Sequence, residues 1–191
     1  LMNVKSKKKV FYWSPCLNKV GTVISTKNSA IALAKYKKDI YSVSVINVCG
    51  EWNDYIEQFK KNGVSVINLT FNYHSYLPKT GFLKSRFSHI LIFIISLFPL
   101  ILCLKKQKPN FIILHLITSL PLFIMRLFKF ETKFILRISG FPKLNLIRRF
   151  FWKGSSKKLY KITCPTKELL QKIKFENIFN KDKICFLQDA I

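Results

Sequence analysis

The chain has 191 residues, of which 49% are hydrophobic, and a formal net charge of +24 with a pI near 10. The apolar content excludes a disordered chain, and the length allows one substantial core. The lysines are spread along the chain without zinc-finger spacing, an RNP motif or a short three-helix pattern, so nucleic acid is not an expected partner. A basic surface also suits anionic lipid headgroups or phosphorylated substrates, and a genomic bias toward lysine would produce part of the same charge.

Five cysteines form no C-x-x-C pair, and an odd number does not suit a secreted disulfide framework. Cys49 and Cys164 lie in or beside expected strands, which favours small buried thiols in a reducing compartment. The chain begins at Leu1 instead of Met and stops at Ile191, just after an expected strand. We therefore expect a fragment of a longer protein.

The N-terminal part reads as strand, loop and helix. Lys9 to Ser14 is the first expected strand, Pro15 to Thr22 a loop that contains Gly21, and Ile24 to Lys37 an amphipathic helix. Gly21 and Thr22 could belong to a phosphate or substrate loop. No G-x-G-x-x-G or P-loop motif accompanies them, and a simple tight turn fits the same residues.

A second and a third strand follow, at Tyr41 to Val48 and at Val64 to Leu69. Between them, Asp54 is expected to cap a short helix over Tyr55 to Lys61, and Gly63 to end it. The β-α-β-α-β order of these elements favours a parallel α/β sheet. The long polar and aromatic loop after the third strand contains a histidine, His74, which is either solvated or part of a binding site.

The apolar run from Phe87 to Leu104 has the length of a transmembrane helix. Basic residues flank both of its ends, so they give no orientation, and Pro99 lies inside it. A span would also place the strands on either side of the run in different compartments, where they could not share one sheet. We expect a buried or membrane-surface helix, with a true span as the alternative.

A βαβ unit lies at the centre of the chain, between Lys108 and Gly140. Its strands are Phe111 to Leu114 and Phe134 to Ile138, joined by a helix over Leu120 to Phe130. Polar side chains follow both strands, at His115, Thr118 and Ser119 and at Ser139-Gly140. Ligands of open parallel sheets bind at the carboxyl ends of the strands, so these residues are candidates for a binding crevice.

The remainder continues the same pattern. The segment from Phe141 to Lys158 is basic and amphipathic, which fits either a membrane-surface helix or an ordinary solvated one. A strand is expected at Leu159 to Cys164, a helix capped by Thr166 at Lys167 to Lys174, and a last strand at Ile184 to Leu187.

The chemistry that the sequence lacks narrows its function. It has nine acidic residues, no plausible carboxylate pair, no H-E-x-x-H or G-x-S-x-G motif, and no cluster with metal-ligand spacing. A self-contained hydrolase or metalloenzyme is therefore not supported, and we expect neither a metal nor a cofactor.

The order of these pieces resembles the N-terminal half of GT-B glycosyltransferases of the broad family 4 type. The resemblance covers nearly the whole chain and is carried by the first strand and its glycine loop, the long apolar helix, and the segments GVSVINL, KPNFIILHLITSLP, TKFILRISGFP, YKITCPTKELLQKI and NKDKICFL. Two departures matter. Many members have two adjacent glycines in the first loop, where this chain has only Gly21, and a His-Gly or His-Asp where it has Ser139-Gly140.

The resemblance implies a Rossmann-like α/β domain over residues 1–191, a parallel sheet between two layers of helices, which binds the acceptor. A C-terminal lobe that binds the nucleotide-sugar donor would follow it, so the chain alone would be inactive. The implied enzyme transfers a sugar to a lipid-linked or glycan acceptor in cell-envelope polysaccharide synthesis. It would be cytoplasmic and peripheral on the anionic inner face of the cell membrane.

The same resemblance implies roles for individual residues. His115 would lie at the catalytic cleft and contact the transferred sugar, with a hydrogen-bonded core histidine as the alternative. Arg137 and Arg148 would meet a phosphate of a lipid-linked acceptor, or else be ordinary surface charges. Two other protein classes compete with a glycosyltransferase lobe: a non-catalytic membrane-surface binding protein of the same fold, and a small integral membrane protein.

Overall fold

The computed structural model describes residues 6–18, 21–115, 120–142 and 144–189. The strands are β1 (Lys8–Trp13), β2 (Tyr41–Asn47), β3 (Val64–Asn68), β4 (Phe111–His115), β5 (Lys133–Arg137), β6 (Lys161–Cys164) and β7 (Ile184–Phe186). The helices are α1 (Gly21–Tyr36), α2 (Ile56–Lys61), α3 (Phe82–Gln107), α4 (Leu120–Leu127), α5 (Leu146–Ser156) and α6 (Lys167–Phe175). Three short 3₁₀ turns lie at Asn53–Tyr55, His74–Tyr76 and Lys181–Lys183.

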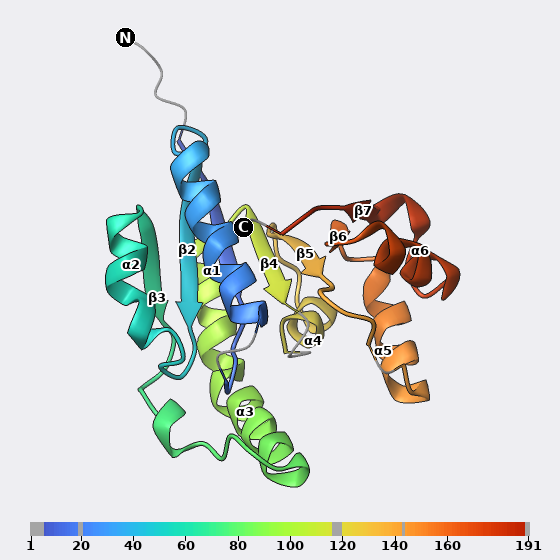
Figure 1. Cartoon of the computed structure of the whole chain (residues 1–191), viewed down its shortest axis with the longest axis horizontal. Coiled ribbons are helices and arrows are strands. Elements are labelled where there is room, and N and C mark those ends of the chain that lie inside the picture. Colours follow the sequence, from blue (N-terminus) through green and yellow to red (C-terminus); the bar gives the residue numbers. More distant parts are fainter. Residues whose placement is uncertain (1–5, 19–20, 116–119, 143, 190–191) are drawn as a thin grey trace.

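All seven strands are parallel and form one sheet in the order β3-β2-β1-β4-β5-β6-β7 (Figure 1). The expected α/β fold with a Rossmann-like parallel sheet is therefore confirmed. The strand order reverses between β1 and β4, because β1 leads to β2 on one side while β4 leads to β5 on the other. At such a reversal the loops after the two strands diverge, which leaves a crevice at their carboxyl ends.

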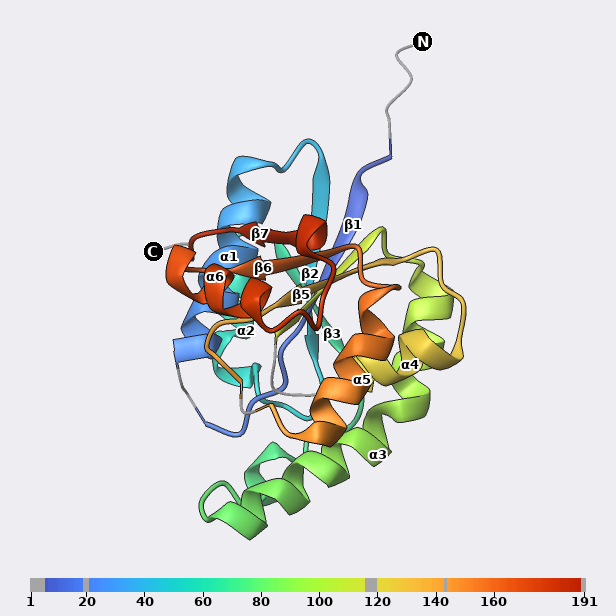
Figure 2. The ribbon, with the colours of Figure 1, turned by 90° about the vertical axis from the view of Figure 1, so that its right-hand side faces the viewer.

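Helices cover the sheet from both sides, as the views in Figures 1 and 2 show. The alternation of side chains along β1 accounts for the two layers of core. Val10 and Tyr12 pack with residues of α1 and α2, whereas Phe11 and Trp13 pack with residues of α3 to α6. A central parallel strand that is buried on both faces needs such a continuous apolar run, and β1 supplies it.

The start of α1 differs from the sequence-based expectation. The helix begins at Gly21, so Gly21 and Thr22 lie in its first turn instead of in a loop. Its buried face includes Val23 and Thr26, whereas Ile24, the first residue of the expected amphipathic helix, is 53% exposed. Because Thr26 is polar, the pattern of apolar residues did not indicate which face of the helix is buried. The Thr26 hydroxyl donates a hydrogen bond to the Thr22 carbonyl at 2.7 Å.

Two helix caps were also predicted. Asp54 is not the cap of α2: it lies in a 3₁₀ turn, and the N-cap position is Tyr55, which makes no side-chain capping bond. The cap of α6 is as expected, with the Thr166 hydroxyl accepting a hydrogen bond from the Leu169 amide at 3.1 Å. Asn145 caps α5 in the same way.

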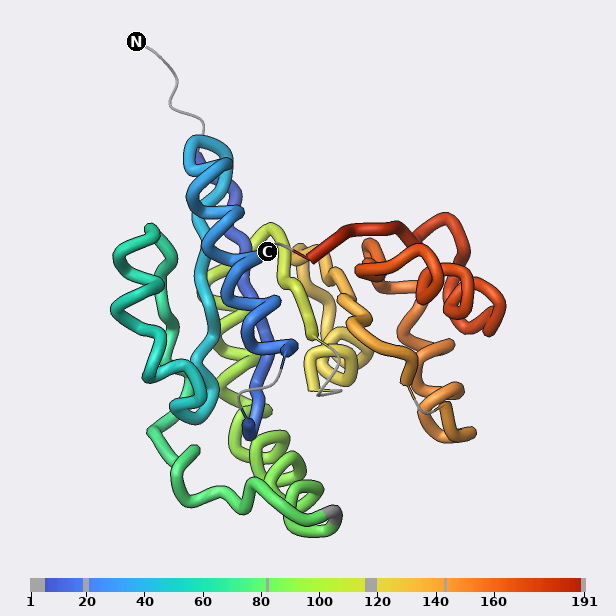
Figure 3. Tube along the Cα trace, in the orientation of Figure 1, coloured from blue at the N-terminus to red at the C-terminus, as the bar shows by residue number. Residues whose placement is uncertain are grey.

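The helix α3 is longer than predicted and crosses from the β3 edge of the sheet to the amino end of β4. The tube in Figure 3 shows its first turns projecting beyond the carboxyl ends of the strands. Leu83–Gln107 is long and apolar enough to span a membrane by length and composition, and 33% of its most apolar window is buried. Ile92, Leu100 and Leu104 are its most buried large side chains and belong to the main core.

A strained turn follows β2 at the carboxyl edge. Gly50 has a φ of +104°, and a Cβ at this position would lie 2.0 Å from the Asn72 side-chain oxygen. The next residue, Glu51, is buried and accepts hydrogen bonds from the Val48 and Cys49 amides at 3.0 and 2.8 Å. This carboxylate therefore ties the turn to the end of its own strand.

Replacing Gly50 by alanine should destabilise the protein by roughly 1–3 kcal/mol, since the added methyl meets both an unfavourable backbone conformation and the Asn72 amide. Urea unfolding monitored by circular dichroism measures this change. Gly21→Ala is the matched control, because Gly21 has no positive φ and nothing within 4 Å of an added Cβ. Equal unfolding midpoints for the two variants would contradict the proposed strain.

Candidate functional site

Two polar side chains meet where the strand order reverses. His115 and Arg137 are the last residues of β4 and β5, and they are paired in the register of the sheet. Paired residues of neighbouring strands face the same side of the sheet. Because side chains alternate along a strand, His115 faces the same side as Ile113, and Arg137 the same side as Ile135. This side is opposite the core that α4 covers. Both side chains are buried, with 0% and 3% of their surface exposed.

The imidazole of His115 is held neutral. Burial and, to a smaller extent, the nearby Arg137 charge lower its pKa, Asp189 partly opposes them, and the resulting pKa is about 3. Neither ring nitrogen has a hydrogen-bond partner among the described residues. The alternative of a hydrogen-bonded core histidine therefore finds no partner in the described part of the chain. A neutral imidazole offers one donor and one acceptor to a ligand.

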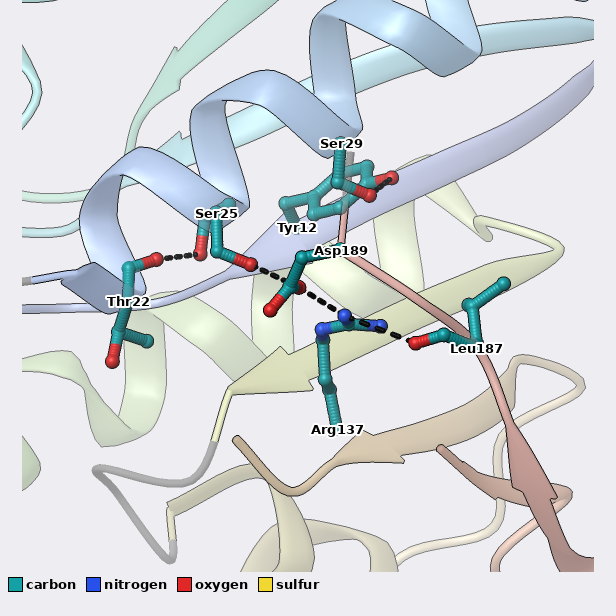
Figure 4. Close-up of polar contacts among 8 residues, drawn as sticks. Tyr12, Thr22, Ser25, Ser29, Arg137, Leu187 and Asp189 are labelled. Carbon is teal, nitrogen blue, oxygen red and sulfur yellow. Dashed lines mark hydrogen bonds and ion pairs between the residues drawn. The ribbon is translucent and has the colours of Figure 1, made fainter. Parts of the chain in front are cut away.

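Arg137 is paired with a residue from the far end of the chain. Its Nη2 donates hydrogen bonds to the Asp189 carboxylate and, at 3.3 Å, to the Leu187 carbonyl. The Ser25 hydroxyl on α1 donates to the same carboxylate (Figure 4). We call residues 187–189 the strap, because this segment runs from the end of β7 across the carboxyl ends of the strands to α1.

The other predicted site residues differ in their burial and surroundings. Ser139 follows β5, and its buried hydroxyl has no partner among the described residues. Gly140 is exposed with open space around it, and Arg148 is exposed on α5. Thr118 and Ser119 lie outside the described residues.

A cavity of about 370 Å³ opens beside the ends of β1 and β2. His74 is one of its lining residues, and its Nε2 lies 3.0 Å from the Cys16 carbonyl. The lining is rich in side chains that hydrogen-bond to hydroxyl groups: Asn18, Glu51, Asn53, Asp54, Asn72, His74, Ser75 and Lys79. Such a lining suits a polyol or sugar better than an apolar ligand.

Sequence reasoning missed three features of this edge. Asn47 orders the loops around the cavity, because its Nδ2 donates to Asn53 and Asn68 at 2.9 Å each. Glu51 holds a turn, and burial raises its pKa. Asp189 reaches Arg137 across a separation of 52 residues. An acid directly after a strand-ending glycine was the available signal for Glu51, whereas local sequence carries none for Asp189.

The described residues contain no group of three His, Cys, Asp or Glu side chains that could hold a metal ion. All five cysteines are free thiols, and Cys49 and Cys164 are buried as predicted. The site can therefore act in two ways: the neutral imidazole of His115 can form hydrogen bonds with hydroxyl groups, and the guanidinium of Arg137 can pair with an oxyanion.

Comparison with known proteins supports the architecture. No family model matches the chain, and no curated protein matches it significantly. Among solved structures it is similar to a glycosyltransferase from Rickettsia africae ESF-5, with a TM-score of 0.60 and 15% identity over 95% of this chain and 43% of that one. It is also similar to the calicheamicin glycosyltransferase CalG4, with a TM-score of 0.59 and 10% identity over 96% of this chain and 53% of that one.

A putative UDP-N-acetylglucosamine 2-epimerase from Listeria monocytogenes has the same fold, with a TM-score of 0.59 and 13% identity over 94% of this chain and 44% of that one. This chain thus spans about half the length of the solved structures it matches. It has the fold of one Rossmann-like half of a GT-B protein, as expected; family 4 in particular remains a prediction.

The depressed pKa of His115 predicts a specific acid sensitivity. The unfolded chain binds a proton on this residue below pH 6.5, whereas the folded chain does so only near pH 3. Stability should therefore fall as the pH drops through this window, by at most about 1.4 kcal/mol per pH unit from this group. His115→Gln should remove that part of the slope, as measured by urea unfolding from pH 7 to pH 4.

His89→Gln serves as the comparison, because His89 is only half-buried on α3, and burial also lowers its pKa. Its replacement should flatten the slope less than that of His115. If His115→Gln leaves the pH dependence of the unfolding free energy unchanged, the imidazole is not held neutral by the fold.

Proposed function

We propose that this chain is the acceptor-side lobe of a glycosyltransferase that transfers a sugar from a nucleotide-sugar donor to a lipid-linked or glycan acceptor, in the synthesis of a cell-envelope polysaccharide. The observation that carries the proposal is the buried, neutral His115 at the strand-order reversal, whose two ring nitrogens have no partner in the described chain. The amide-rich cavity beside the ends of β1 and β2 supports a hydroxyl-bearing acceptor.

In this proposal, His115 acts on a sugar through hydrogen bonding. A strand fixes its backbone, and burial fixes the ring in the neutral form. A donor held in advance next to a reacting sugar needs no reorganisation when charge develops in the transition state. The donor nucleotide-sugar would be bound largely by a second lobe, so the chain by itself is expected to transfer no sugar.

In the complete protein, His115→Ala should lower turnover roughly a hundredfold or more, the usual cost of losing one preorganised donor. Sugar transfer is measured by product formation from the nucleotide-sugar, and the melting temperature is measured in parallel. The matched control is His89→Ala on α3, which should leave turnover unchanged. A large drop in the melting temperature of the His115 variant, or turnover within about threefold of the wild type, would indicate that His115 has a structural role only.

The same assay separates the competing functions. Incubation of the nucleotide-sugar without acceptor would yield an isomerised donor if the protein were a 2-epimerase, the activity named for the Listeria structure. Absence of any turnover by the complete protein would favour a non-catalytic membrane-surface binding protein.

A membrane-linked acceptor is supported by the outer face of α3. Six large apolar side chains at helical spacing are 58–76% exposed along this face: Leu83, Phe87, Ile90, Ile94, Phe98 and Leu102. Basic residues flank the helix at both ends, and the chain as a whole is strongly basic. An apolar stripe with basic flanks matches the boundary of an anionic bilayer, such as the cytoplasmic leaflet.

The arrangement favours a peripheral helix. The inner face of α3 belongs to the main core, and the strands that precede and follow the helix lie in one sheet. A span would have to withdraw that face from the core. The first two turns of α5 also expose Leu146, Ile147 and Phe150, and both helices begin at the carboxyl edge of the sheet (Figure 2). The edge that carries His115 would therefore face the lipid.

The triple variant Phe87→Ser, Ile94→Ser, Phe98→Ser should lower binding to phosphatidylglycerol vesicles more than tenfold, because each change removes apolar area that the bilayer would bury. Vesicle co-sedimentation measures the partition. The control is Tyr36→Ser with Ile40→Ser, two exposed apolar residues away from the stripe, which should bind like the wild type. Unchanged binding of the triple variant, or resistance of the protein to alkaline carbonate extraction, would contradict peripheral docking through this face.

A further inference from the structure

The guanidinium of Arg137 is an unusual group to bury at the end of a strand. Only 3% of the residue is exposed, and a buried charge is costly unless it is paired. The carboxylate that pairs with it belongs to Asp189, whose side chain is 37% exposed. The pair thus joins a fixed, buried cation to an anion on a segment that solvent reaches.

The surroundings of Arg137 hold more donors than this carboxylate uses. Its Nε has no partner among the described residues, although a guanidinium has five N–H groups arranged to bind oxyanions side-on. The two ring nitrogens of His115 and the hydroxyl of Ser139 are likewise buried and unpartnered in the described chain. Three of these four buried atoms can donate a hydrogen bond, namely Arg137 Nε, one imidazole nitrogen and the Ser139 hydroxyl, so together they suit a ligand with several acceptor oxygens.

The strap is held in a way that permits release. The Leu187 amide donates to the Cys164 carbonyl at 2.9 Å, which extends the pairing with β6. Asp189 is attached only through its carboxylate, to Ser25 and to Arg137, among the contacts described (Figure 4). An anion that competes for Arg137 would free this end of the strap without unpairing β7.

We propose that Arg137, with His115 and Ser139, forms a binding site for a phosphate or diphosphate group, and that the Asp189 carboxylate occupies this site in the free chain. A phosphate oxyanion carries more charge and more acceptor oxygens than a carboxylate and suits the guanidinium fork. Binding displaces Asp189 and so releases this end of the strap from Arg137 and Ser25. The proposal deepens the glycosyltransferase function, since donor and lipid-linked acceptor both contain diphosphate.

The test measures inorganic pyrophosphate binding to the intact chain by isothermal titration calorimetry, without any sugar transfer. Asp189→Asn removes the competing charge and should raise the pyrophosphate affinity about tenfold. Glu176→Gln is the matched control: it also breaks an Arg–carboxylate pair, with Arg149 at the outer side of the molecule, and changes the net charge equally. It should leave the affinity near that of the wild type.

A double variant, Arg137→Met with Asp189→Asn, removes both charges and so leaves no unpaired ion buried. It should fold and should lose the affinity gained by Asp189→Asn. Hydrogen–deuterium exchange gives a second readout, because pyrophosphate should speed exchange in the strap of the wild-type chain while the amides of β5 stay protected.

Equal affinities of Asp189→Asn and Glu176→Gln would overturn the proposal, as would a double variant that binds as tightly as Asp189→Asn. Two further ligands identify the source of the diphosphate. Preference of Asp189→Asn for uridine diphosphate assigns the site to the donor, and preference for farnesyl diphosphate assigns it to a lipid-linked acceptor. Failure of sugar transfer with retained pyrophosphate binding would count against the proposed function alone.

Discussion

The pairing of β1 with both β2 and β4 is the constraint on which the rest of the structure depends. Because β1 has a parallel neighbour on each side, the chain must build one half of the sheet outward to β3 and then return to the centre. The return is made by α3, which explains why this helix is long and why one of its faces is apolar toward the core. The same pairing creates the reversal of strand order between β1 and β4, beside which His115 and Arg137 lie.

Charge is distributed unevenly between surface and site. The chain has 33 basic and only nine acidic residues, and the acids at the carboxyl edge include Glu51 and Asp189. Glu51 orders a turn by accepting backbone hydrogen bonds, whereas Asp189 neutralises a buried guanidinium. The acids near the site thus act in positioning and in neutralising charge. The carboxyl edge is left with hydrogen-bonding groups, which suits the sugar transfer that we propose.

The fold was largely predictable from sequence because its signals are local. Seven apolar runs and the helices between them follow from periodicity, and the βα alternation implies parallel strands. The phase of α1 was wrong because Thr26, a polar residue, occupies its buried face, and the cap at Asp54 was wrong because the chain forms a 3₁₀ turn there. The order of strands in the sheet depends on contacts between distant segments, which periodicity does not contain.

For the candidate site too, residues with a local sequence signal could be predicted, and residues that depend on distant contacts could not. His115 was a candidate because strand ends in a parallel sheet converge, a rule that needs only the positions of the strands, whereas Arg137 was a candidate through the family resemblance. The strap was not found, because its contact with Arg137 depends on where β7 ends in space. Glu51 was missed because a carboxylate that serves backbone amides has no distinctive spacing.

The central position of β1 also has a consequence for how the chain folds during synthesis. Its pairing with β2 joins residues about thirty positions apart, but its second neighbour begins at Phe111, about a hundred positions later. Until β4 is made, one edge of this central strand, with the apolar rings of Phe11 and Trp13, stays open to other unfinished chains. Contacts of such long range slow folding and expose strand edges to aggregation. The half-sheet β1-β2-β3 is thus an early folding unit that would benefit from a chaperone until the centre of the sheet closes.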